Sequence, residues 1–288
     1  MKSKIGELLK YGYKILKNRG ICSYILDAQL LLGKAMNKDR LFIIINRNYE
    51  VTEKEAEDYY RYLKLREKRM PVKYILGECE FMGLNFFIKP GVLIPRPDTE
   101  ILVEQALQKI KNNNFHNICD LCCGSGAIGL SIAKFTDDVN VKCCDISSMA
   151  LKVTAENMKR LSLQERVQII RSDLLEYFIE NKMKFQMIIS NPPYIKKNVI
   201  GTLMDDVKNY EPYEALCGGE DGLVFYRKIA EEGLKVLDKN GVLMFEIGDD
   251  QKDEVGCILQ KHGFQDISCV KDLSKRDRVM SAVVKAVK

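Results

Sequence analysis

The pattern of apolar and polar residues predicts helices over roughly the first 70 residues. Near the start, apolar side chains recur every three to four positions, at Ile5, Leu8, Leu9, Tyr13 and Leu16. This spacing places them on one face of a helix, and residues 25–32 repeat it. Residues 41–45 (Leu-Phe-Ile-Ile-Ile) fit either a buried helix or a strand. We favour a helix because the flanking segments are helical.

A further helix is predicted to begin at Thr52, where Thr-Glu-Lys-Glu matches the capping-box pattern. It ends before Pro71, because proline cannot continue a helix. We therefore predict a small helical domain over residues 1–72. This domain has no glycine-rich loop, metal cluster or catalytic triad of its own. It is either a packing domain or a docking surface for a macromolecular substrate.

Residues 73–97 are predicted to connect this domain to the rest of the chain. Residues 81–88 suggest a β-hairpin with Gly83 and Asn85 near its turn. Two prolines then fix the backbone on either side of Arg96, and a helix is predicted from Asp98, because acidic residues in a first turn suit the helix dipole. Arg96 is therefore either part of a structural turn or a cation held over a site.

From residue 117 onward, predicted strands alternate with helices, which indicates an α/β domain with a doubly wound sheet over residues 98–288. The last two strands are joined by a short connection and can pair antiparallel at one edge of the sheet. Strands are expected at residues 117–121, 139–144, 167–171, 185–190, 241–247, 265–270 and 278–286.

The composition of the 288 residues excludes several classes of protein. No stretch approaches the length of apolar sequence that a membrane-spanning helix needs. The charged N-terminus lacks the apolar segment of a signal peptide, so we expect a cytoplasmic protein. The net charge of +5 permits an acidic partner but does not require one.

Ten cysteines are many, but their placement argues against a disulfide framework. Several lie in or just after predicted core strands, where a free cysteine behaves as a small apolar residue. Cys119 and Cys122 form a Cys-x-x-Cys pair without the second pair that a zinc site needs. With only His116 and His262 in the chain, we expect neither a metal site nor a histidine-based triad.

A glycine loop follows the first strand of the predicted sheet. It runs Asp120-Leu-Cys122-Cys123-Gly124-Ser125-Gly126, and its two glycines allow a tight turn and a close approach of backbone to ligand. The helix that begins there has free N–H groups. A Gly-x-Gly sequence alone is weak support for a cofactor site.

Acidic residues at the next two strand ends strengthen this interpretation. Asp145 ends the second strand, where a carboxylate can accept both hydroxyls of a ribose. Asp173 follows the third strand and can accept an exocyclic adenine N–H, while Leu174 can pack on the ring. Each aspartate alone could instead be a helix N-cap. An NAD(P) site is a weaker interpretation, because nothing indicates a hydride acceptor.

The most specialised segment is Ser190-Asn191-Pro192-Pro193-Tyr194. It falls at the carboxyl end of the fourth strand, where open α/β sheets bind ligands. The prolines lack N–H groups and fix φ, so the loop is stiff. The Asn191 amide and the backbone carbonyls offer acceptors, and Tyr194 adds a flat face, which suits a planar NH2 ligand. Asn-Pro is also an ordinary dipeptide of surface turns.

Together, these strand ends resemble those of class I S-adenosylmethionine-dependent methyltransferases. More narrowly, the chain is similar to the HemK/PrmC family of peptide chain release factor glutamine methyltransferases. Asn-Pro-Pro-Tyr alone is shared with adenine methyltransferases of DNA, so the narrower signals are Pro-Arg-Pro-Asp-Thr-Glu and Gly-Gly-Glu-Asp-Gly-Leu. The similarity rests on four segments: residues 94–100, the glycine loop, residues 191–194 and residues 211–223.

The resemblance implies a Rossmann-like seven-stranded sheet behind a small helical domain. It implies S-adenosylmethionine as methyl donor, S-adenosylhomocysteine as product, and the glutamine amide of a release factor's Gly-Gly-Gln loop as acceptor. Asn191 and the Pro192 carbonyl would accept the amide hydrogens, Pro193 and Tyr194 would sandwich the amide, and Arg96 would face the substrate. The helical domain would bind the release factor. We expect a monomer with no nucleic-acid target and no membrane association.

One position departs from the family pattern, because Cys122 stands where such methyltransferases usually have glycine. If φ is positive there, the Cβ atom costs about 1–2 kcal/mol, and affinity for the donor is in question. If φ is negative, cysteine is tolerated.

Three alternatives remain at this stage. A glutamine methyltransferase acting on a ribosomal protein would share nearly all the motifs. An adenine-N6 methyltransferase of nucleic acid would share the donor site and Asn191, but would normally add a base-reading domain. A binding scaffold whose donor site no longer binds S-adenosylmethionine would explain Cys122. The intact Asp145, Asp173 and Asn191 argue against this alternative.

Overall fold

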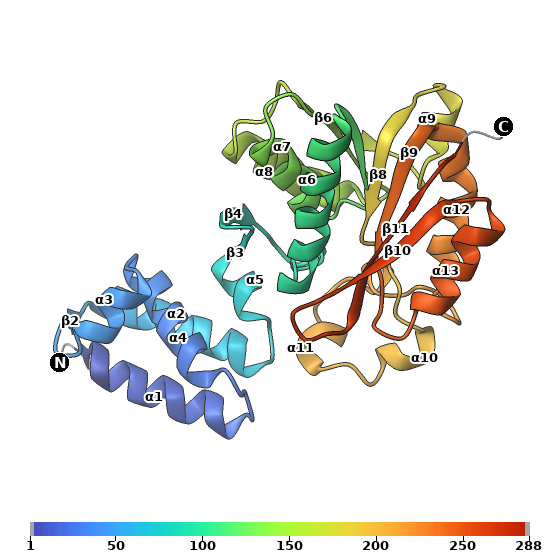
Figure 1. Cartoon of the computed structure of the whole chain (residues 1–288). Helices are drawn as coiled ribbons and strands as arrows, with labels where there is room; N and C mark the ends of the chain where they lie inside the picture. The colour runs from blue at the N-terminus through green and yellow to red at the C-terminus, as the bar shows by residue number, and fades with distance from the viewer. Residues whose placement is uncertain (1–2, 286–288) are drawn as a thin grey trace. The chain divides into compact units, whose positions relative to one another are not determined.

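The computed structural model describes residues 3–285, which fold as two compact units (Figure 1). The first unit comprises the chain up to Glu78 together with Met204–Tyr210. The second comprises Cys79–Leu203 and the chain from Glu211 onward. The first unit thus includes a segment from far along the sequence, which the hydrophobic pattern of the N-terminal region does not reveal.

The first unit is helical, as predicted. Its apolar helix faces share one core, in which Leu9, Leu16 and Tyr59 are fully buried. Residues 40–45 form a helix, and the predicted capping box is present, since the Thr52 side chain accepts from the Glu55 N–H. The elements are β1 (Ser3–Lys4), α1 (Ile5–Asn18), α2 (Tyr24–Met36), α3 (Arg40–Ile45), β2 (Glu50–Val51), α4 (Glu53–Glu67), α5 (Val72–Leu76) and α11 (Asp205–Lys208).

A buried arginine joins the distant α11 to this helical unit. Arg66 on α4 donates from Nε to Asp27 on α2 at 2.7 Å and from NH1 to Asp206 on α11 at 2.6 Å. Its side chain is 6% exposed. A charge this deeply buried needs such partners, because removing them leaves it unpaired in the interior.

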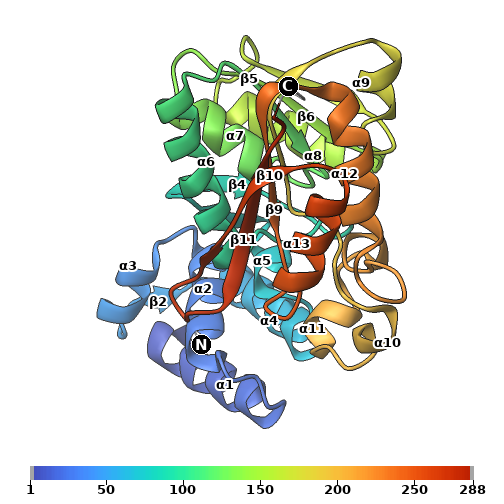
Figure 2. The same cartoon turned by 45° about the vertical axis from the view of Figure 1, so that its right-hand side comes forward.

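The second unit is built on a seven-stranded sheet in the order β10-β11-β9-β8-β5-β6-β7. The five strands from β9 to β7 are parallel, whereas β11 runs antiparallel to both of its neighbours, β9 and β10, as Figure 2 shows at the near edge of the sheet. The strands are β5 (Asn117–Leu121), β6 (Asn140–Asp145), β7 (Val167–Arg171), β8 (Phe185–Ser190), β9 (Leu237–Glu246), β10 (Gln265–Lys271) and β11 (Asp277–Val283).

This topology confirms the predicted doubly wound sheet and its antiparallel edge. Two of the predicted strand bounds differ appreciably: β9 begins four residues earlier than the Gly241 expected from its apolar run, because Leu237 already pairs with Phe185. The last strand ends at Val283, and Ala286, the predicted end, lies outside the described residues.

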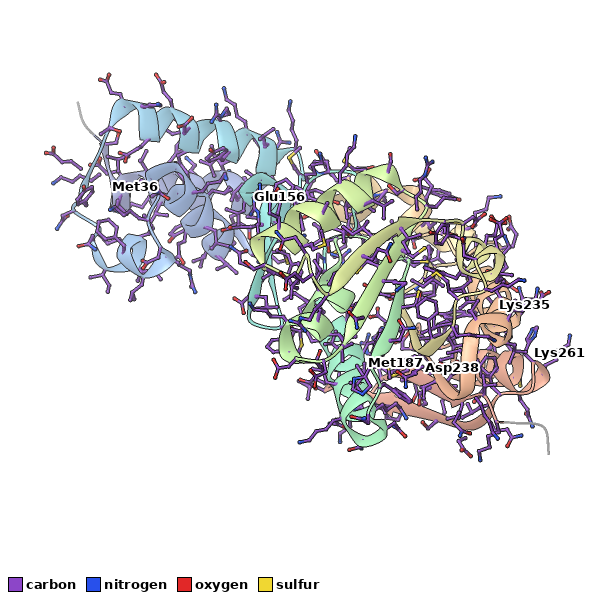
Figure 3. All side chains as sticks on the ribbon, turned by 90° about the horizontal axis from the view of Figure 1, so that it is seen from above. Met36, Glu156, Met187, Lys235, Asp238 and Lys261 are labelled. Atoms are coloured by element: carbon purple, nitrogen blue, oxygen red, sulfur yellow. The ribbon has the colours of Figure 1, made fainter. Side chains whose placement is uncertain are left out.

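Helices cover both faces of the sheet (Figure 1). Alternate residues of each central strand point to opposite faces: Ile118 and Met187 pack with α6–α8, whereas Cys119 and Ile188 pack with α9, α12 and α13. Figure 3 labels Met187 of β8, which is fully buried. The helices are α6 (Glu100–Asn113), α7 (Ala127–Phe135), α8 (Ser148–Arg160), α9 (Glu176–Glu180), α10 (Lys197–Ile200), α12 (Val224–Val236) and α13 (Lys252–Lys261), with 3-10 turns η1 (Pro97–Thr99) and η2 (Tyr213–Ala215).

The predicted hairpin is formed by β3 (Glu78–Phe81) and β4 (Leu84–Phe87). Its turn consists of Met82 and Gly83, which both have positive φ, whereas Asn85 lies within β4. Such two-residue turns match the twist of the strands that they join. The Met82 N–H donates to Glu100 at 2.7 Å, so the hairpin is attached to the first turn of α6.

Candidate active site

The carboxyl ends of β5, β6, β7 and β8 border one cavity of about 750 Å³, within the usual range for small-molecule sites. Each of these four strands contributes a loop. The β9–α13 connection does not line the cavity, but residues of the 91–99 segment and of the connection between β8 and β9 complete its wall. The strand-end residues that line it are Cys122, Cys123, Gly124, Ser125, Asp145, Ile146, Ser147, Ser172, Asp173, Leu174, Asn191 and Pro193.

The glycine loop turns sharply between β5 and α7. Gly124 and Gly126 have φ of +57° and +78°, values that favour glycine. Gly126 does not line the cavity. A Cβ atom there would lie 2.8 Å from Thr154 Cγ2, so this glycine allows the loop to pack against α8.

The two cysteines of the loop differ in conformation. Cys122 has φ of +58°, so the condition under which its Cβ atom carries a strain cost is met. Cys123 is buried in the core, although it also borders the cavity. Burial raises the pKa of the Cys122 thiol well above its usual value, which keeps it protonated and poorly nucleophilic.

Asp145 connects the glycine loop to the end of β6. Its Oδ2 atom accepts from the Gly124 N–H at 2.9 Å, and its Oδ1 atom accepts from the Ser147 N–H at 2.8 Å. Burial raises the pKa of this carboxyl, and the backbone N–H groups of Ser147, Gly124 and Ile146 oppose that rise. Ser147, not Asp145, caps α8 with its side chain. Each carboxylate oxygen keeps a second lone pair for a ligand hydroxyl.

Asp173 and Leu174 follow β7 on the next side of the cavity. Asp173 is exposed and Leu174 is buried, with φ of +45°. Asp173 does not cap α9, because the N-cap position of that helix is Leu175. The cavity wall thus combines carboxylates from two strand ends with the apolar side chain of Leu174.

Asn191 borders the cavity after β8, and a hydrogen bond to Thr99 holds its side chain. Its Nδ2 atom donates to Thr99 Oγ1 at 3.3 Å. Ser190 donates to the Leu121 carbonyl at 2.7 Å, which ties the end of β8 to β5. Pro193 also borders the cavity. The backbone is therefore rigid at the point where Asn191 meets the cavity.

Pro192 and Tyr194 do not line the cavity. Pro192 is buried. The Tyr194 ring packs against the core that covers the α12 face of the sheet, and its hydroxyl donates to Glu246 Oε1 at 3.1 Å. Tyr194 is therefore turned away from the position of an aromatic lid in this structure, because Glu246 offers its hydroxyl a buried acceptor.

The segment after β8 folds back onto the tetrapeptide. Ile195 N–H donates to the Leu216 carbonyl and Gly218 N–H to the Ile195 carbonyl, each at 2.9 Å. The buried Gln251 donates from Nε2 to the Tyr194 carbonyl at 3.1 Å. The Gly-Gly-Glu-Asp-Gly-Leu motif thus supports the Asn-Pro-Pro-Tyr loop, and nearby Pro212, Glu214 and Ala215 add to the cavity wall.

Arg96 lines the same cavity and is anchored by a buried carboxylate. Its NH2 atom donates to Glu211 Oε1 at 2.6 Å, and the side chains of Arg96 and Glu211 are 38% and 1% exposed. Burial raises the pKa of Glu211, and the Arg96 charge opposes that rise. Arg96 is thus both part of a structural pair and a cation at the cavity.

The residues that support the Asn191 loop, Thr99, Glu246 and Gln251, were not identified from the sequence. Thr99 lies in the Pro-Arg-Pro-Asp-Thr-Glu motif, and that motif was the only signal for it. Glu246 and Gln251 lie at and after the end of β9, where no local pattern distinguishes a supporting side chain from a surface one.

Residues 3–285 contain neither a metal site nor a membrane-spanning helix. In this part of the chain, no three His, Cys, Asp or Glu side chains are arranged to hold a metal ion. No helix in it combines the length and apolar character needed to cross a membrane.

Comparison with known proteins links both units to one kind of enzyme. Residues 7–77 match the family model described as "PrmC N-terminal domain", and residues 97–207 match "Methyltransferase small domain". A release factor glutamine methyltransferase of Clostridium botulinum is 54% identical over 276 residues, covering 96% of this chain and 98% of the relative. One of Clostridium acetobutylicum is 50% identical over 280 residues, covering 97% and 98%.

A solved structure supports the fold alone. A methyltransferase from Pyrococcus furiosus superposes with a TM-score of 0.52 at 16% sequence identity, covering 79% of this chain and 99% of that one.

Proposed function

Because the chain belongs to the family of release factor glutamine methyltransferases, as its motifs indicated, we propose that it methylates the side-chain amide nitrogen of a release factor glutamine. S-adenosylmethionine is the methyl donor and S-adenosylhomocysteine the product. The proposed acceptor is the glutamine of the Gly-Gly-Gln loop.

The observation that carries this proposal is that Asn191 lines the same cavity as Asp145 and Asp173. Two carboxylates that can accept hydrogen bonds from a nucleoside, and an amide oxygen that can accept one from a glutamine, thus line one cavity. A donor and a glutamine side chain bound in that space would be neighbours, and positioning of this kind supplies much of the rate gain in a transfer reaction.

The donor site fits S-adenosylmethionine residue by residue. Asp145 has free lone pairs for ribose hydroxyls, Asp173 is exposed to accept an adenine amino hydrogen, and Leu174 offers an apolar side chain to the ring. The loop Cys122, Cys123, Gly124 and Ser125 would hold the methionine part, and Gly126 shapes the turn. When bound, the donor supplies a methyl group on a positively charged sulfur.

The acceptor site is formed by the Asn-Pro-Pro-Tyr loop. We assign to the Asn191 Oδ1 atom the acceptance of one amide hydrogen, which holds the nitrogen in place. Pro192, whose carbonyl is the second predicted acceptor, does not line the cavity in this structure, so its role requires the loop to shift when substrate binds. Pro193 provides an apolar wall for the planar amide. For Tyr194, whose hydroxyl is bound to Glu246, we propose an anchoring role for the loop in place of stacking on the substrate.

Arg96 and the helical unit are the proposed contacts to the rest of the substrate. Arg96 keeps donors that Glu211 does not occupy and can bind backbone carbonyls of the substrate loop. The helical unit would bind the release factor body, because one amide offers too little surface for specificity. We further propose a monomer that acts in the cytoplasm without a nucleic-acid target.

Methyl transfer from labelled S-adenosylmethionine to a purified release factor tests the function. The matched control is the same release factor with its loop glutamine replaced by alanine. Label on the first and none on the second is the expected result. Equal label on both would overturn the assigned acceptor.

The remaining candidate acceptors are tested in the same assay with ribosomal proteins and with adenine-containing nucleic acid. Label on either of them, with none on the release factor, would replace the proposed substrate. Failure of the wild-type protein to bind the donor at all would support the scaffold alternative and would make Cys122 the residue to explain.

A further inference from the structure

Thr99 and Glu246 form a second layer behind Asn191. Thr99 ends the η1 turn and is 4% exposed, and Glu246 ends β9 and is 1% exposed. Thr99 Oγ1 accepts from Asn191 Nδ2 at 3.3 Å. Asn191, Thr99 and Glu246 come from three segments that are far apart in the sequence, and Thr99 makes the contact with the asparagine side chain.

The Glu246 carboxyl determines how the Thr99 hydroxyl is used. Its Oε1 atom accepts from Tyr194, and Oε2 is buried without a well-formed hydrogen bond among the described residues. Burial raises the pKa of Glu246, and the nearby Thr99 and Tyr194 hydroxyls oppose that rise. A hydroxyl has a single proton, and with that proton directed to the Glu246 side, Thr99 Oγ1 accepts from Asn191 Nδ2.

The hydrogen bond to Thr99 sets which way the Asn191 amide faces. An acceptor at Thr99 requires the NH2 end of the amide, which leaves Oδ1 on the opposite side. If the amide were flipped, its NH2 group would face the NH2 group of the substrate, and two donors cannot hydrogen-bond to each other. The orientation of Asn191 therefore decides whether an amide substrate can bind productively.

We propose that Thr99, held by Glu246, is a positioning residue that keeps Asn191 Oδ1 available to accept a hydrogen from the substrate amide. This inference rests on the proposed function, because it assigns Asn191 to an amide acceptor site. Thr99 itself need not touch the reacting atoms.

The first test compares Thr99→Val with Thr99→Ser in the full chain, using S-adenosylmethionine and a purified release factor. Valine keeps the shape but removes the hydroxyl. We expect kcat to fall by about 10- to 100-fold, with donor affinity close to that of the wild type. Serine restores the hydroxyl and most of kcat.

Three outcomes would overturn the proposal. The first is an unchanged kcat in Thr99→Val. The second is an equal loss in the valine and serine variants, which would point to shape in place of hydrogen bonding. The third is a loss of donor binding in parallel with kcat, which would indicate a general structural role.

A second measurement does not depend on the substrate. The side-chain NH2 resonances of Asn191, assigned by their loss in Asn191→Asp, are recorded in the wild type and in Thr99→Val. We expect them to shift and to exchange faster with water in the valine variant, and unchanged resonances would refute the positioning role. If the wild type does not methylate a release factor, the proposed function fails, while these resonances still decide the role of Thr99.

Discussion

Gly218 lies so close to Tyr194 that a Cβ atom on the glycine would stand 2.7 Å from the Cα atom of the tyrosine. The same Cβ atom would lie 2.8 Å from the Pro193 carbonyl oxygen. Both neighbours are backbone atoms of the loop that carries Asn191, so they cannot move away without moving that loop.

We therefore predict that Gly218→Ala lowers stability by about 1–3 kcal/mol, the usual cost of overpacking, and lowers kcat for methyl transfer more than donor affinity. Thermal unfolding, donor titration and steady-state kinetics measure the three quantities. Gly201→Ala is the matched control, because Gly201 has φ of −62° and its Cβ atom would meet nothing within 4 Å. Similar effects in both variants would rule out the proposed loop contact as the cause.

The two adjacent cysteines of the glycine loop should respond in opposite directions to replacement by glycine. Cys122 has φ of +58°, whereas the φ of Cys123 is not positive. Relief of backbone strain in Cys122→Gly offsets the lost side chain, so we expect stability to be unchanged or raised by up to about 1 kcal/mol. Cys123→Gly loses a buried side chain and gains backbone freedom, at a cost of about 2 kcal/mol.

Urea unfolding of both cysteine variants measures these changes. If Cys122→Gly is destabilised as much as Cys123→Gly, the positive φ carries no strain cost that glycine relieves. Donor titration of the same proteins shows whether the departure from glycine at this position also lowers affinity.

Most of the fold could be predicted because its signals are local. The apolar runs that form most of β8 and the second half of β9 are bounded by polar or glycine residues, a pattern typical of buried parallel strands. Asp145 and Asn191 were identified for the same reason, since each stands at the carboxyl end of such a run. Parallel topology then brings those ends to one edge of the sheet.

The supporting contacts could not be predicted because they join segments that are distant in the sequence. Thr99 and Asn191 are separated by 92 positions, and Gln251 and Tyr194 by 57. The direction of the Tyr194 ring depends on the buried Glu246, which the sequence around Tyr194 does not indicate. The inclusion of Met204–Tyr210 in the helical unit depends likewise on the buried Arg66.

Asn191→Ala removes the proposed amide acceptor while leaving the donor side of the cavity intact. We expect methyl transfer to the release factor to fall by at least about 100-fold, the usual effect of losing one well-placed polar group at a reacting centre. Donor affinity should remain close to that of the wild type, because Asp145, Asp173 and Leu174 are unchanged. Near-normal turnover in this variant would exclude the role assigned to Asn191.

Asp120 makes the stability of the second unit depend on pH. Its carboxyl is fully buried beneath the glycine loop, where Oδ2 accepts from the Gly129 N–H at 2.8 Å. Burial raises its pKa from 3.8 to about 7, against the opposing effect of that N–H group. Between these two values the folded protein holds a proton that the unfolded chain has lost, so stability falls as pH rises.

We predict that the free energy of unfolding of the wild type falls by about 3 kcal/mol more between pH 5 and pH 8 than that of Asp120→Asn. The variant has no carboxyl to titrate at this position, and its amide oxygen can still accept from Gly129. Urea unfolding of both proteins across this range gives the difference directly, and the contributions of the other titratable groups cancel in the comparison. Parallel curves would mean that Asp120 ionises in the folded protein as easily as in the unfolded chain.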